Sequence, residues 1–178
     1  MENQAKDKRE GSHEPPEGKA GERGRLVAMG EVPGVRAELE GQRIVVTNGC
    51  FDLLHVGHLR CLDFARSLGD LLWVGINDDR SVRSQKGENR PIHAEAERAE
   101  LLAGLRPVDL VTVFSGRRAT AFLQAVRPTV YVKGGDYRRE TLDAEEREAL
   151  ERMGAEIRFF PLVEGRSTTA AWEALQKR

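Results

Sequence analysis

The sequence has few cysteines and no long hydrophobic run, and these two shortages exclude several classes of protein. Only Cys50 and Cys61 are present, which excludes a disulfide-rich secreted scaffold. The longest uncharged apolar run, Leu71 to Ile76, is far shorter than the roughly 20 residues of a membrane-spanning helix. The first 25 residues also lack the apolar core of a secretory signal. We therefore expect a cytoplasmic protein with no membrane partner.

A strong charge of either sign is also missing. The 178 residues carry a formal net charge of -1, with an isoelectric point of about 6.5. Nucleic acids select basic surfaces, so no nucleic-acid partner is expected. Hydrophobic residues make up 39% of the chain and charged residues 32%, which is typical of one globular domain with a proper core.

The composition changes along the chain. Residues 1–24 combine charges of both signs with glycine and two adjacent prolines. Burial of the few apolar side chains in this segment would not offset the loss of conformational entropy on folding. We therefore predict a disordered tail. Residues 25–40 are expected to be a transition segment with a short helix around Val35 to Leu39. Residues 41–178 are expected to form the folded domain.

Beyond residue 41, strand-like apolar runs alternate with helical patterns. The predicted strands are Arg43–Asn48, Leu71–Ile76, Val108–Phe114, Thr129–Val132 and Glu156–Phe160. The predicted helices are Val56–Leu68, Ala94–Leu105, Arg118–Val126, Ala144–Met153 and Thr169–Gln176. Such alternation predicts a parallel sheet covered on both faces. With right-handed crossovers, the fold is a Rossmann-like, doubly wound α/β domain with five strands. Its ligands would bind at the carboxyl ends of the strands.

Two common phosphate-binding fingerprints are missing. Residues 48–52 lack G-x-G-x-x-G, and G-x-x-x-x-G-K-[ST] occurs nowhere, which disfavours nicotinamide enzymes and P-loop NTPases. Instead, His55-Val56-Gly57-His58 stands at the start of the first predicted helix of the domain. A helix N-terminus offers unpaired N–H groups and partial positive charge, and Gly57 lets a phosphate approach the backbone. His55 and His58 add hydrogen-bond donors, so the motif predicts a phosphate site.

Two other interpretations of the histidine pair stay open. One histidine could cap the helix while the other is exposed. Alternatively, Cys50, His55, His58 and Cys61 could bind zinc in a non-catalytic module. Structural zinc sites usually take two short ligand pairs separated by a loop, whereas these four residues share one strand end and one helix face.

Residues 47–58 resemble the signature of the HxGH nucleotidyltransferases. Further segments together resemble bacterial D-glycero-β-D-manno-heptose 1-phosphate adenylyltransferases, over about residues 41–178. These segments are Lys86-Gly87, Asn89-Arg90-Pro91-Ile92, Val132–Tyr137 and Val163–Thr169. The resemblance implies that ATP, accompanied by Mg²⁺, reacts with the sugar 1-phosphate to give pyrophosphate and ADP-heptose for lipopolysaccharide core. A cytidylyltransferase acting on a polyol phosphate is the alternative with the same fold.

The resemblance and the positions at strand ends assign residues to three roles. The predicted catalytic residues are His55, His58, Lys133 and Arg166. The predicted nucleotide-binding residues are Asn48, Gly49, Cys50, Phe51, His55, Gly57, His58, Arg166, Ser167, Thr168 and Thr169. The predicted substrate-binding residues are Asp52, Asn77, Asp79, Lys86, Arg90, Arg98, Lys133, Gly134, Gly135 and Asp136.

Several of these residues also have a purely structural interpretation. Ser167 or Thr168 could cap the last predicted helix. The polar segment that carries Lys86 and Arg90 could be a solvated loop, and Arg98 is expected on the surface of its helix. Gly134 and Gly135 could simply make a turn, and Asp52 could form an Asx-turn.

The resemblance also implies partners for the protein. Relatives suggest a homodimer. Many relatives carry a fused sugar kinase for which this chain has no room, so a separate heptose kinase and a phosphatase are expected to supply its substrate.

Overall fold

The computed structural model describes residues 23–135 and 137–161. Most of the predicted tail, Asp136, residues Arg166 to Thr169 and the predicted helix Thr169–Gln176 lie outside the described residues.

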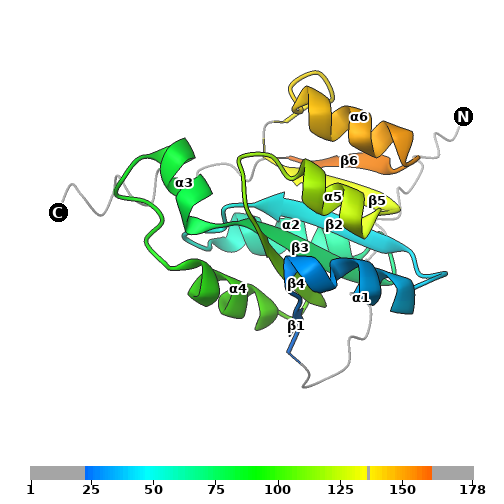
Figure 1. The fold of residues 1–178 in the computed structure, drawn as a ribbon, viewed down its shortest axis with the longest axis horizontal. Coiled ribbons are helices and arrows are strands. Elements are labelled where there is room, and N and C mark those ends of the chain that lie inside the picture. Colours follow the sequence, from blue (N-terminus) through cyan, green and yellow to red (C-terminus); the bar gives the residue numbers. More distant parts are fainter. Residues whose placement is uncertain (1–22, 136, 162–178) are drawn as a thin grey trace, which may run out of the picture.

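A parallel sheet of six strands forms the centre of the molecule (Figure 1). The strands are β1 (Arg25–Leu26), β2 (Ile44–Gly49), β3 (Leu71–Asn77), β4 (Leu110–Phe114), β5 (Val130–Gly134) and β6 (Glu156–Phe160). Their spatial order is β1-β4-β3-β2-β5-β6, and every neighbouring pair is parallel. The helices are η1 (Met29–Glu31), α1 (Val32–Glu38), α2 (Val56–Arg66), α3 (Asp79–Lys86), α4 (Glu95–Ala103), α5 (Thr120–Val126) and α6 (Ala144–Arg152).

Helices cover both faces of this sheet, so two hydrophobic cores form. On one face, side chains of α1, α5 and α6 pack on alternate strand residues such as Val46 and Trp73. On the other face, α2 and α4 pack on the intervening residues such as Val45 and Val74. In the view of Figure 1, α1 and α5 lie in front of the sheet and α2 lies behind it. All seven residues of β3 are buried, as expected of a central parallel strand.

The predicted Rossmann-like α/β architecture is confirmed, but the predicted number of strands is wrong. The sixth strand is β1, where Arg25 and Leu26 pair with Leu110 and Val111 of β4. A segment of two residues is too short to show the alternating pattern of a strand in the sequence. It is a strand only because it pairs with β4, far along the chain. The segment 25–40, expected to be a transition, also contributes Val32 and other buried side chains to the core.

A second difference lies between β3 and α4. The polar residues after Asn77 form helix α3, because the carboxylate of Asp78 accepts a hydrogen bond from the backbone N–H of Ser81 and caps it. Lys86 is therefore the last residue of a helix rather than part of a loop. Arg90 is buried, at 7% exposure, so it does not lie in a solvated loop either.

The strand order places the switch point of the sheet between β2 and β5. The chain runs from β2 outward to β3 and β4, then returns to the other side of β2 to form β5 and β6. Helices that leave the two neighbouring strands on opposite faces open a crevice at their carboxyl ends. None of the described helices combines the length and the apolarity needed to cross a membrane.

Candidate active site

A cavity of about 760 Å³ opens at the carboxyl ends of β2 and β5. Its wall combines these strand ends with the first turn of α2, the end of α3, the turn after β4 and the first residues of α6. The predicted site residues that line it are Asn48, Gly49, Cys50, Phe51, His55, Gly57, His58, Asn77, Lys86, Lys133, Gly134 and Gly135. The fold thus brings together twelve predicted residues that span almost ninety positions of the chain.

The two histidines are held by the backbone at the start of α2. His55 is the N-cap, and its Nδ1 accepts a hydrogen bond from the N–H of Gly57 at 3.1 Å. His58 Nδ1 accepts from the N–H of His55 at 3.3 Å. The two rings stack with centroids 3.9 Å apart. One histidine does cap the helix, as the plain interpretation held, but both rings also line the cavity.

These hydrogen bonds decide which ring nitrogen carries the proton. A nitrogen that accepts a hydrogen bond needs its lone pair, so the hydrogen of each neutral ring must be on Nε2. Burial, helped by His55 and Lys86, lowers the pKa of His58 to about 4. His58 is therefore neutral near pH 7 and acts as an Nε2–H donor, suited to a phosphoryl oxygen.

Lys133 ends the neighbouring strand β5 and faces the same cavity. Its Nζ lies 3.4 Å from Asn48 Oδ1, which also accepts a hydrogen bond from the hydroxyl of Tyr131. Gly134, which follows, permits the close approach of α2, because a Cβ there would lie 2.7 Å from Cys61 Sγ. β5 and α2 therefore present an ammonium and two imidazole donors to one space.

Asp52 and Arg90 do not line the cavity but form a buried ion pair beside it. Asp52 Oδ1 also accepts a hydrogen bond from the backbone N–H of Ile92 at 2.7 Å. The pair ties the turn after β2 to the chain that leads into α4. Its predicted contact with substrate stays a prediction.

Arg98 is fully buried, which corrects the expectation of a surface position on its helix. Its guanidinium donates to the carbonyl oxygens of Cys50 at 2.6 Å and Asn77 at 2.8 Å. It also donates to Asp79 Oδ1 at 2.8 Å and to the carbonyl oxygen of His93 at 3.0 Å. Arg98 and Asp79 thus hold the ends of β2 and β3 from behind the cavity wall rather than from within it.

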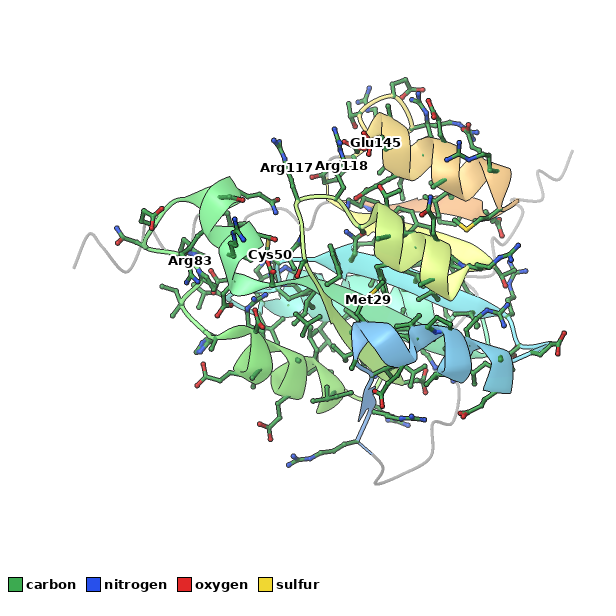
Figure 2. The ribbon with its side chains drawn as sticks, viewed as in Figure 1. Met29, Cys50, Arg83, Arg117, Arg118 and Glu145 are labelled. Carbon is green, nitrogen blue, oxygen red and sulfur yellow. The ribbon has the colours of Figure 1, made fainter. Side chains whose placement is uncertain are left out.

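Sequence reasoning missed a second group of charged residues in the cavity wall. Arg117 and Arg118 stand on the turn after β4, and Asp143 and Glu146 stand at the start of α6. Arg118 pairs with Asp143 at 2.8 Å and with Glu145 at 2.7 Å. Figure 2 shows Arg118 beside Glu145, whereas Arg117 projects separately from the same turn. The signal for Arg117 and Arg118 was their position directly after a predicted strand.

The cavity is suited to an anion. It is lined by four cationic side chains, Lys86, Arg117, Arg118 and Lys133, and by the N-terminal turn of α2. Its carboxylates are already engaged, since Asp143 pairs with Arg118 and Glu146 accepts from the N–H of Ala119. Among the described residues, no three side chains of His, Cys, Asp or Glu are arranged to hold a metal ion.

Comparison with known proteins agrees with this geometry. The sequence model of a family described as cytidylyltransferase-like matches residues 46–173. The chain belongs to the cytidylyltransferase-like family. It carries a nucleotidyltransferase domain, and the predicted nucleotidyltransferase type of α/β fold is confirmed.

Several curated proteins are similar to this chain over most of its length. The protein named Bifunctional protein HldE of Geobacter sulfurreducens is 48% identical over 139 residues, which are 78% of this chain and 28% of that protein. The protein of the same name from Koribacter versatilis is 52% identical over 129 residues, 72% of this chain and 26% of that protein. The chain therefore spans less than a third of the length of these curated relatives.

A solved structure shares the fold. The lipopolysaccharide core biosynthesis protein from Thermoplasma volcanium superposes with a TM-score of 0.58 at 26% identity, covering 71% of this chain and all of that one. A pantoate-beta-alanine ligase from Francisella tularensis superposes with a TM-score of 0.56 at 15% identity, over 82% of this chain and 69% of that one, which shows the fold alone.

Proposed function

We propose that this chain is an adenylyltransferase that converts ATP and D-glycero-β-D-manno-heptose 1-phosphate to ADP-heptose and pyrophosphate, for lipopolysaccharide core. The observation that carries the proposal is the pair of backbone-oriented imidazoles, His55 and His58, in the same cavity as Lys133. The sequence resemblance to heptose 1-phosphate adenylyltransferases supports the choice of substrates. The names of the relatives, which include a lipopolysaccharide core biosynthesis protein, agree with it.

The proposed chemistry needs no general base. An oxygen of the sugar phosphate, already an anion, attacks the α-phosphorus of ATP, and the bond from that phosphorus to the bridging oxygen of the β-phosphate breaks. The electron pair leaves with pyrophosphate. Catalysis is then positioning plus stabilisation of charge on the phosphoryl oxygens. His55 and His58 would donate from Nε2 to these oxygens, and Lys133 would hold the sugar phosphate.

Mg²⁺ fits this site as an ion that enters with the nucleotide. Mg²⁺ in such enzymes is held mainly by substrate phosphates and one or two carboxylates. Asp143 and Glu146, which line the cavity, are engaged with Arg118 and Ala119, so the triphosphate would supply most of its ligands. The ion would neutralise charge on the triphosphate. Arg166, Ser167 and Thr168 are proposed to hold the leaving pyrophosphate.

One observation favours a second candidate. The matching family is described as cytidylyltransferase-like, and the donors in the described part of the cavity are suited to phosphate rather than to the selection of a base. A cytidylyltransferase that acts on a polyol phosphate would use the same imidazoles and lysine.

Pyrophosphate release across a matrix of nucleotides and phosphorylated acceptors distinguishes the two candidates. We expect turnover with ATP and heptose 1-phosphate to exceed that with any other pair. Equal or faster turnover with CTP, or with a polyol phosphate, would transfer the protein to the second candidate. No pyrophosphate from any pair would reject both. The homodimer is a further proposal, which is tested by the mass of the protein in solution.

A further inference from the structure

Lys133 stands in a part of the cavity wall that is nearly closed to water. Its side chain is 13% exposed. The rings of Tyr131 and Tyr137 lie 5.8 and 5.1 Å from its Nζ, and Asn48 Oδ1 lies at 3.4 Å. Burial lowers the pKa of Lys133, because an ammonium group loses solvation there. A negative charge beside this lysine would favour its protonated form.

Glu146 on α6 supplies that charge. Its Oε2 lies 3.9 Å from Lys133 Nζ, and its own side chain is only 6% exposed. No other carboxylate of residues 23–135 and 137–161 lies within ion-pairing distance of Lys133. The charge of Glu146 opposes the effect of burial, with smaller contributions from Cys50 and Asp143.

The second oxygen of Glu146 has a separate task. Oε1 accepts a hydrogen bond from the N–H of Ala119 at 2.7 Å. Ala119 follows the turn that carries Arg117 and Arg118, so one buried carboxylate joins that turn to the end of β5. A buried carboxylate is costly unless it is paired and hydrogen-bonded, and here both oxygens are used.

We propose that Glu146 is a positioning residue of this site, which keeps Lys133 protonated and directed at the cavity so that its ammonium can hold an anionic substrate group. The inference rests on the proposed function for the identity of that group, the sugar phosphate. Glu146 itself touches no reacting atom. It acts through Lys133.

Glu146→Gln separates this role from a purely structural one. The amide keeps an oxygen for the N–H of Ala119 but removes the negative charge beside Lys133. Glu145→Gln is the matched control: it is the adjacent residue, loses the same charge, and pairs with Arg118 instead. Circular dichroism and melting temperature check that each variant folds.

Two measurements follow for each variant. The first is the pH dependence of acetylation at Lys133, read by peptide mass spectrometry on the intact folded chain. The second is the pH dependence of KM for the sugar phosphate, with kcat measured alongside. In Glu146→Gln, we expect Lys133 to become reactive at lower pH, because its neutral amine is more populated. We also expect the increase in KM for the sugar phosphate between about pH 7 and about pH 9 to be about tenfold larger in Glu146→Gln than in the wild type.

A rescue variant sharpens the second measurement. Lys133→Arg in the Glu146→Gln background carries a guanidinium that stays charged at these pH values, so the additional rise in KM should disappear. If Glu146→Gln does not fold, Glu146→Asp carries the acetylation test. Its carboxylate is withdrawn by one methylene, and a smaller shift in the same direction is expected.

The outcomes distinguish this inference from the proposed function. An acetylation profile of Lys133 that Glu146→Gln leaves unchanged, or that Glu145→Gln shifts equally, overturns the role of Glu146. That role is also overturned if Glu146→Asp is needed and shows no shift. The acetylation profile of Lys133 could shift in Glu146→Gln although the wild-type protein releases no pyrophosphate with any of the substrate pairs. That result would uphold the control of Lys133 by Glu146 and reject the proposed function.

Discussion

The backbone N–H of His55 donates to Nδ1 of His58, at the first turn of α2. A peptide N–H can only donate, so this contact requires the lone pair of His58 on Nδ1 and its proton on Nε2. His55 is set in the same way by the N–H of Gly57. The backbone at the helix start thus holds two imidazole rings with Nε2 available toward the cavity before any ligand binds.

If His58 donates to the transferring phosphoryl group, His58→Ala should lower kcat by about 10²–10³, as is usual for the loss of one such donor. The melting temperature should change little by comparison. The measurement is pyrophosphate release with the best substrate pair. Cys61→Ser is the control and should be nearly silent in both respects. A Cys61→Ser protein that unfolds and releases zinc would instead support the metal-binding interpretation.

The low pKa of His58 predicts a loss of stability in acid. The folded-state value of about 4 lies below the usual 6.5, so the unfolded chain binds the proton more tightly. Stability is therefore unaffected above about pH 6.5 and falls as the pH drops from there to about 4. The loss from this one group is at most about 3 kcal/mol.

Urea denaturation at several pH values measures this effect. His58→Gln removes the titrating group, so the free energy of unfolding should fall less between pH 6.5 and pH 4 than in the wild type. His93→Gln is the control, because it removes an imidazole whose side chain is 42% exposed. If the free energy of unfolding falls equally with decreasing pH in the wild type and in His58→Gln, His58 is not held neutral by burial.

Arg117 should act on substrate affinity. It lines the cavity and forms no ion pair with the described residues, whereas its neighbour Arg118 pairs with Asp143 and Glu145. A charge-assisted hydrogen bond to phosphate is worth about 1.5–3 kcal/mol, so Arg117→Ala should raise one KM about 10- to 100-fold. Separate KM values for the nucleotide and the sugar phosphate show which anion is contacted. Arg117→Lys should raise the same KM by a smaller factor. If both KM values are unchanged in Arg117→Ala, Arg117 does not contact either substrate.

Arg98 should matter for stability and for the shape of the cavity. Its guanidinium makes four hydrogen bonds, which include those to the carbonyl oxygens of Cys50 and Asn77. Arg98→Met leaves these acceptors and Asp79 without their donor, and should lower the free energy of unfolding by about 3–5 kcal/mol. Urea denaturation measures this change in the free energy of unfolding. Arg80→Met, at an exposed position on α3, should be nearly neutral. A stable Arg98→Met protein that loses only turnover would indicate direct contact with a ligand instead.

The local patterns of the sequence determined the class of fold and one half of the site. Apolar runs that alternate with amphipathic stretches predicted the parallel sheet and four of the observed helices, because burial on both faces leaves a signature within each segment. The motif His55-Val56-Gly57-His58 places a backbone N–H of its own helix start at Nδ1 of each ring, so this part of the site could be predicted from adjacent residues.

Only the tertiary structure decided the rest, because its contacts join residues that are distant in the chain. β1 is a strand only through its pairing with β4. Arg98 is buried because the ends of β2 and β3 converge on it, although its helix reads as a surface helix. The charge state of Lys133 depends on Glu146, which stands on the next helix along the chain in a charged stretch where no local pattern distinguishes it from Glu145. Residue type and spacing identified the chemistry that could occur, and packing selected which of the charged side chains would serve it.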